Sequence, residues 1–94
     1  MIRGEDIKKF WDYNVEEFGK DEISWVVEDF GLDLSRIEDE ALESASEEEL
    51  KVLYADIVYM ILNELNSGDF NSMYDVLSDI MELSKEDIDY LLDW

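Results

Sequence analysis

The sequence predicts an all-α protein: a single acidic domain over residues 1–94, built as a compact bundle of five to six short helices around a central buried helix at about 47–65. Apolar residues recur at the three- and four-residue spacing of a helix face along nearly the whole chain. Glycine, serine and aspartate stand between these segments, where helices begin and end. The hydrophobic fraction of 47% supplies a core, and a chain of 94 residues suits one domain rather than two.

Two helices are expected first, over about 5–18 and 21–30. A glycine follows each of them, Gly19 and Gly31, and glycine is the residue that most readily ends a helix. Trp25 lies off the second apolar stripe, which predicts that it is partly exposed. The two stripes are Ile7, Phe10, Trp11, Val15 and Phe18, then Ile23, Val26, Val27 and Phe30.

A third and weaker helix is expected after Leu32 and Leu34. Asp33 or Ser35 can cap its first turn, because both side chains accept hydrogen bonds from backbone N–H groups. The segment is the most acidic of the chain, and its apolar line is thin: Ile37, Ala41 and Ala45.

The central helix begins with a capping box, in which Ser46 and Glu49 satisfy each other's backbone donors. Because this helix is apolar nearly all round, it is expected to be buried on several sides. One face consists of Leu50, Leu53, Tyr54, Ile57, Val58, Ile61 and Leu65, and the other side adds Val52, Tyr59, Met60 and Leu62.

Two further helices complete the expected bundle. After a turn at 66–68, a helix over about 69–83 is predicted to bury Phe70, Met73, Tyr74, Leu77, Ile80 and Met81. The last helix follows Ser84, with Asp87 in its first turn, and its core contacts are Ile88, Leu91 and Leu92. Trp94 either packs back against the bundle or lies exposed.

The charge excludes several functions. The chain has 27 Asp and Glu against 7 Lys and Arg, a net charge of −20, so it repels both phosphate and anionic membranes. It contains no His and no Cys, the commonest general base and the thiolate ligand. We therefore expect no enzyme, no cofactor and no metal site. No signal peptide or spanning segment is recognisable, which predicts a cytoplasmic protein.

The acidic surface is the candidate binding site. A net charge of about 2–8 suffices for the solubility of a small domain, so −20 calls for another explanation, such as a strongly basic partner. Carboxylates four residues apart on a helix lie ~6 Å apart along its axis, a density approaching that of nucleic-acid phosphates at ~3.4 Å per nucleotide. The candidate residues are Asp12, Glu16, Glu17, Glu28, Asp29, Glu38, Asp39, Glu40, Glu43, Glu47, Glu48, Asp75, Asp79 and Glu82.

In length, charge and expected helicity the chain resembles the small, acidic, all-helical DNA-mimic inhibitors of phages and mobile elements, which include anti-restriction and anti-CRISPR proteins. The stretch Tyr54-Ala55-Asp56-Ile57 is similar to a tetrapeptide of a phage anti-restriction protein. The resemblance implies an inhibitor that blocks the DNA- or RNA-binding site of a bacterial defence nuclease, first of all a CRISPR effector. The expected location is then the cytoplasm of a bacterial host cell.

A second resemblance leads to an alternative function. The stretch Ser46-Glu47-Glu48-Glu49-Leu50 resembles part of the colicin-type nuclease immunity proteins, although the chain lacks their Tyr-Tyr-Pro element. This resemblance implies an immunity or antitoxin protein that neutralises a basic nuclease toxin. A regulatory interaction domain without mimicry is a third reading. All three accommodate a monomer or a dimer.

Overall fold

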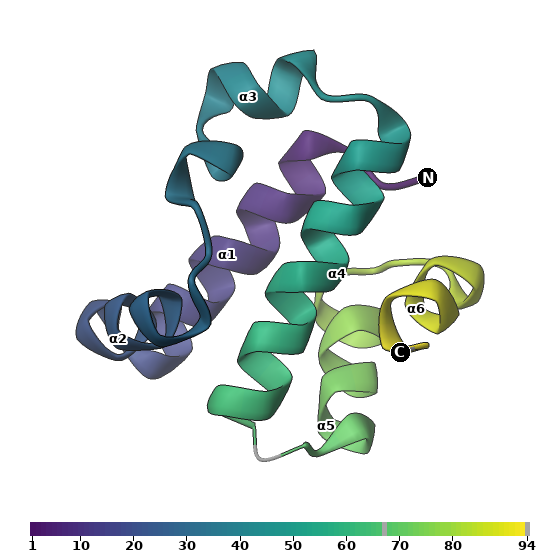
Figure 1. The fold of residues 1–94 in the computed structure, drawn as a ribbon. Coiled ribbons are helices and arrows are strands. Elements are labelled where there is room, and N and C mark those ends of the chain that lie inside the picture. The colour runs from purple at the N-terminus through teal and green to yellow at the C-terminus, as the bar shows by residue number, and fades with distance from the viewer. Residues whose placement is uncertain (67, 94) are drawn as a thin grey trace.

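The computed structural model describes residues 1–66 and 68–93, and every regular element in these ranges is a helix. The expected all-α class and the bundle of short helices are confirmed (Figure 1). The expectations for Trp94 and for Ser67 in the turn lie outside the described residues. The elements are α1 (Gly4–Phe18), α2 (Lys20–Phe30), the 3₁₀ helix η1 (Leu34–Ile37), α3 (Asp39–Ser44), α4 (Glu47–Glu64), α5 (Phe70–Asp75), the π-helical turn η2 (Val76–Ile80) and α6 (Lys85–Leu92).

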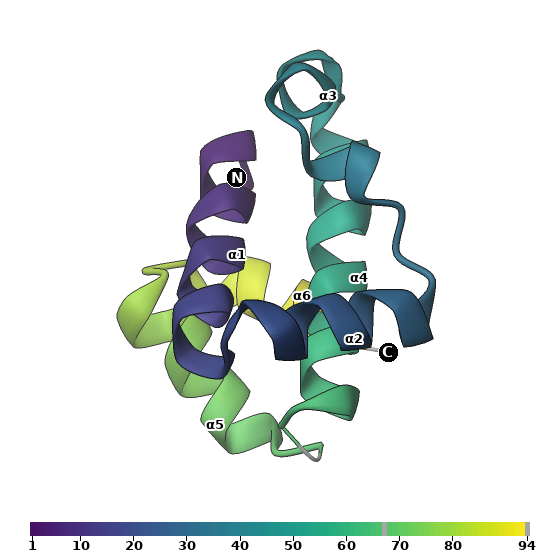
Figure 2. The same cartoon turned by 90° about the vertical axis from the view of Figure 1, so that its left-hand side faces the viewer.

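Helix α4 is the centre of the bundle, as the sequence predicts. It contacts α1, α2 and α6, and its Tyr54, Ile57 and Val58 are fully buried. Figure 2 shows α1 and α4 running beside one another, with α2 lying across them. Helix α4 is buried on several sides, as expected, but Val52 and Tyr59 on its other side are each 43% exposed. Both residues lie on the side of α4 opposite to its buried stripe.

The first two helices follow the sequence closely. In α1, Ile7 and Phe10 are buried, and the remaining stripe residues are partly buried. Asn14 joins this stripe unexpectedly: it is 3% exposed, and its Nδ2 donates a hydrogen bond of 2.8 Å to the carbonyl of Phe10. A polar residue is tolerated in the core because the helix itself supplies the acceptor.

The expected third helix is two short elements. Asp33 caps the first, η1, by accepting hydrogen bonds from the backbone N–H and the hydroxyl of Ser35, at 3.0 and 2.7 Å. The chain leaves the helical conformation at Glu38 and enters α3 directly afterwards. Leu42, absent from the expected apolar line, is the buried residue of α3.

The expected helix over 69–83 is not uniform. A π-helical turn follows α5, with a bond from the Met81 N–H to the Val76 carbonyl at 3.0 Å. Met81 is buried, whereas Ile80 is 41% exposed, so the predicted burial of Ile80 is wrong. Phe70, the first residue of α5, is 49% exposed, so its predicted burial is also wrong.

Candidate functional site

All fourteen candidate acids are exposed. Helix α1 carries Asp12, Glu16 and Glu17, and α2 carries Glu28 and Asp29. The other nine lie in and beside α3, in the first turn of α4, and from the end of α5 to the second residue after η2. The acids therefore occupy several faces of the bundle rather than one cluster.

Few of these carboxylates are neutralised by neighbours. Asp39 forms an ion pair with Lys8 at 3.3 Å, and Glu82 forms one with Lys9 at 3.9 Å. Within residues 1–66 and 68–93, the other twelve candidates form no ion pair. The basic residues are largely engaged elsewhere, as in the pair of Arg36 with Asp56 at 3.0 Å. An approaching cation thus meets mostly carboxylates that no described lysine or arginine neutralises.

The rows of acids differ in regularity. Asp12 and Glu16 lie four residues apart within α1, and Asp39 and Glu43 do so within α3, so each pair keeps a spacing of ~6 Å along its axis. The third row, Asp75, Asp79 and Glu82, passes from α5 through the π-helical turn to a residue with φ of 58°. Regular α-helical spacing does not apply there.

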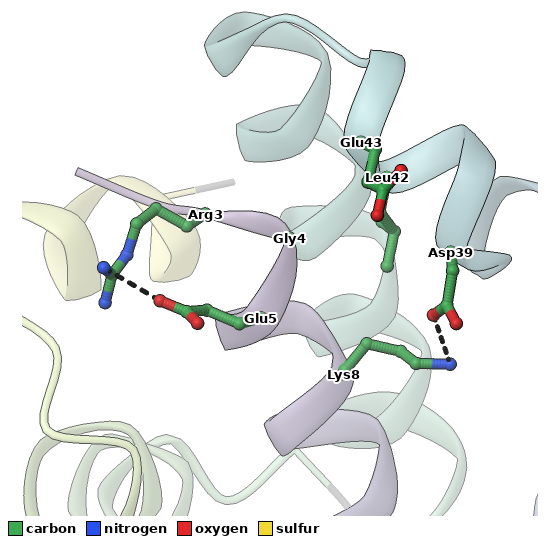
Figure 3. A pocket seen from close by; sticks show the side chains of 7 residues that line it. All are labelled: Arg3, Gly4, Glu5, Lys8, Asp39, Leu42 and Glu43. Atoms are coloured by element: carbon green, nitrogen blue, oxygen red, sulfur yellow. Dashed lines mark ion pairs between the residues drawn. The ribbon is translucent and has the colours of Figure 1, made fainter.

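A hollow of about 490 Å³ lies between the start of α1 and α3 (Figure 3). Asp39, Leu42 and Glu43 line it on the side of α3. Gly4 permits close approach of the two helices, because a Cβ atom there would lie 3.1 Å from the Leu42 Cβ. The two cations at the rim, Arg3 and Lys8, are paired with Glu5 and Asp39 at 2.8 and 3.3 Å. The hollow therefore holds two paired cations and one further carboxylate, that of Glu43, which forms no ion pair with a described residue.

The solvent-facing side of α4 is poor in carboxylates, in contrast to the rest of the surface. We call it the outer face of α4, formed by Val52, Ala55, Asp56, Tyr59 and Asn63. From residue 50 to residue 63, Asp56 is the one acid, and Arg36 pairs with it. The ring of Tyr59 contacts that of Phe30, with centroids 5.9 Å apart.

The solvent-facing side of α2 is rich in carboxylates, and only two of them, Glu28 and Asp29, are among the candidates predicted from the sequence. We call it the outer face of α2, formed by Asp21, Glu22, Trp25, Glu28 and Asp29, all of them exposed. Trp25 itself is 63% exposed, which confirms its expected position off the buried stripe. Asp21 and Glu22 were missed as candidates, although a helical projection of the sequence places them beside Trp25.

Hydrogen bonds and burial shift the pKa values of only a few ionisable groups in the described part of the protein. The pKa of Tyr13 is raised, first by burial and then by the negative charge of Glu17 nearby. The pKa of Asp33 is lowered because Ser35 donates hydrogen bonds to its charged form.

Two further features concern the described part of the chain, residues 1–66 and 68–93. No three His, Cys, Asp or Glu side chains there converge closely enough to hold a metal ion. None of the helices there is both long and apolar enough to cross a membrane.

Comparison with protein-family models, curated proteins and solved structures finds no match to this chain.

Proposed function

We propose that this protein inhibits a bacterial defence nuclease, a CRISPR effector in the first instance, by covering its nucleic-acid-binding surface with carboxylates. The observation that carries the proposal is the exposure of all fourteen candidate acids, twelve of them without an ion pair in the described ranges. A basic channel that binds phosphates attracts such a surface electrostatically.

The helices supply the spacing that mimicry requires. Carboxylates on α1 and on α3 follow one another at ~6 Å, the same order as the separation of phosphates along a strand. The helices hold these side chains on a folded scaffold, so less conformational entropy is lost on binding than with a disordered acidic tail.

The test is cleavage of plasmid DNA by purified nucleases with and without this protein. The panel contains guide-loaded CRISPR effectors and a restriction endonuclease. We expect one nuclease to be inhibited when the protein is added before DNA, and much less when DNA is already bound. Inhibition should weaken with rising salt, since the attraction is electrostatic. A nuclease that binds the protein tightly and still binds DNA normally would refute mimicry.

Charge reversal locates the contact. The double variants Asp12→Lys with Glu16→Lys, and Asp75→Lys with Asp79→Lys, change the net charge equally. They differ in that the first pair lies on the regular helix α1 and the second spans the start of the π-helical turn. We expect the first variant to lose more inhibition. Equal losses would mean that net charge alone matters and would contradict a defined α1 contact.

A further inference from the structure

The exposed indole on the outer face of α2 is the starting observation. Trp25 is 63% exposed, whereas the core aromatics Phe10 and Tyr54 are fully buried. The buried side of α2 consists of Ile23, Val26 and Val27, and α2 packs against α1 and α4. Trp25 projects from the opposite side of the helix and is not needed for this packing.

Four carboxylates surround the indole. Asp21 and Glu22 precede Trp25 by four and three residues, and Glu28 and Asp29 follow it by three and four. Residues at these spacings are surface neighbours on a helix, with Cβ atoms about 5–6 Å apart. None of the four forms an ion pair with another described residue. The face therefore combines a flat aromatic surface with unneutralised negative charge on both sides.

We propose that the outer face of α2 binds an arginine side chain of the partner protein, with the guanidinium stacked on the Trp25 indole. Its N–H groups would donate to the neighbouring carboxylates. Tryptophan is the best aromatic partner for a cation, and the planar guanidinium both stacks on rings and binds carboxylates. The identity of the partner as a basic nuclease rests on the proposed function, whereas the chemistry of this face does not.

The negative charge of the outer face of α2 favours a cationic side chain over other molecules that could bind there. A second copy of the chain, also at −20, is repelled from this face, and so is the phosphate backbone of a nucleic acid. The protein contains a related contact of its own, since the Lys51 ammonium lies 4.5 Å from the centroid of the Tyr90 ring. The same pairing between molecules is expected at Trp25.

The test uses oligoarginine and oligolysine peptides of equal length, titrated into the purified protein by calorimetry. The two probes carry the same charge and differ in the ability to stack. The wild-type protein should bind oligoarginine more tightly. Trp25→Ala should weaken oligoarginine binding about two- to fivefold, the range for a cation–π contact at an exposed site, and should weaken oligolysine binding less, because an ammonium does not stack on the ring. The variant keeps the net charge and removes an exposed side chain, so the fold should persist.

Two matched variants complete the test. Trp25→Phe keeps an aromatic ring and should retain part of the preference for arginine. Tyr59→Ala removes an exposed aromatic residue from the carboxylate-poor outer face of α4 and should leave the preference intact. The proposal is overturned if Trp25→Ala keeps the wild-type preference, or if Tyr59→Ala abolishes it equally. Because the peptides involve no nuclease, this outcome is independent of whether any nuclease is inhibited.

Discussion

Tyr54 lies at the middle of α4, fully buried, with its ring 5.2 Å from that of Phe10. Its hydroxyl has no hydrogen-bond partner in the described part of the protein. A buried hydroxyl without a partner loses its bond to water on folding and gains none in return. The residue therefore contributes apolar packing through its ring and a penalty through its oxygen.

We predict that Tyr54→Phe raises the free energy of unfolding by about 1 kcal/mol, because it removes the unpaired oxygen and keeps the ring. Urea denaturation of the two proteins measures the change. Tyr90→Phe is the control, since that residue is 37% exposed and its hydroxyl can reach water. A Tyr54→Phe protein less stable than wild type would indicate that the hydroxyl has a partner.

The same residue predicts an alkaline response. Burial raises the pKa of Tyr54 well above its ordinary value of 10.0, with a smaller contribution from the charge of Asp6. Above that ordinary value the unfolded chain releases the proton while the folded protein retains it, so stability falls as pH rises, by up to about 1.4 kcal/mol per pH unit. Tyr54→Phe should flatten this decline above pH 10.0. Parallel stability curves for the two proteins would contradict the prediction.

Glu82 adopts a backbone conformation that favours glycine. Its φ is 58°, and the N–H of the next residue, Leu83, donates to the carbonyl of Leu77 at 3.0 Å to close the helix. We predict that Glu82→Gly is about 1 kcal/mol more stable than Glu82→Ala, because alanine keeps the left-handed strain. Both variants lose the charge and the ion pair with Lys9, so thermal melts of the two isolate the backbone term. Equal melting temperatures would contradict it.

Among the elements, α4 begins at a side-chain cap formed by Ser46 and Glu49. The hydroxyl of Ser46 accepts from the N–H of Glu49 at 3.2 Å, and the carboxylate of Glu49 accepts from the N–H of Ser46 at 3.2 Å. Ser46→Ala should lower the free energy of unfolding by about 1 kcal/mol, measured by urea denaturation. Ser44→Ala is the matched control, because its hydroxyl donates within α3 and caps no helix. A smaller loss for Ser46→Ala than for Ser44→Ala would argue against the cap.

Helix positions were predictable where the sequence has both an apolar stripe at helical spacing and a capping residue at its end. Residues 47–49 follow the cap at Ser46, and Gly31 with φ of 82° ends α2, where the pattern placed it. The π-helical turn was not predictable, because Ile80 and Met81 are both apolar and the sequence does not show which of them is buried. Packing against the rest of the core makes that choice.

The candidate site was predictable in kind and only partly in place. Every acid that the sequence singled out is exposed, as carboxylates on helices outside the apolar stripes must be. Pairing could not be read from the sequence, since Lys8 meets Asp39 and Lys9 meets Glu82 only through the fold. The carboxylate-poor outer face of α4 was likewise missed, because its Val52 and Tyr59 read as core residues.

At the scale of the molecule, self-repulsion dominates. The accessible surface is 5712 Å², so twenty net charges have a mean spacing of roughly 17 Å. This spacing is well inside the Debye length of ~30 Å at 0.01 M salt, and it is about twice the Debye length of ~8 Å at physiological salt. We predict that the melting temperature rises between low and physiological NaCl, and for this size about 1 kcal/mol of added stability would raise it by about 4–8 °C. Choline chloride at equal ionic strength should raise the melting temperature by the same amount as NaCl, because screening depends on ionic strength. A melting temperature that falls with NaCl would contradict the prediction.

The scarcity of acids on the outer face of α4 also gives the molecule an orientation. In the field of a cationic surface, such as an anion-exchange resin, the carboxylate-rich sides experience the stronger pull and the protein rotates so that they face the resin. Asn63, exposed on the carboxylate-poor side, then points into the liquid. A dye or tether attached at that position stays accessible while the protein is adsorbed, whichever of the carboxylate-rich faces contacts the resin.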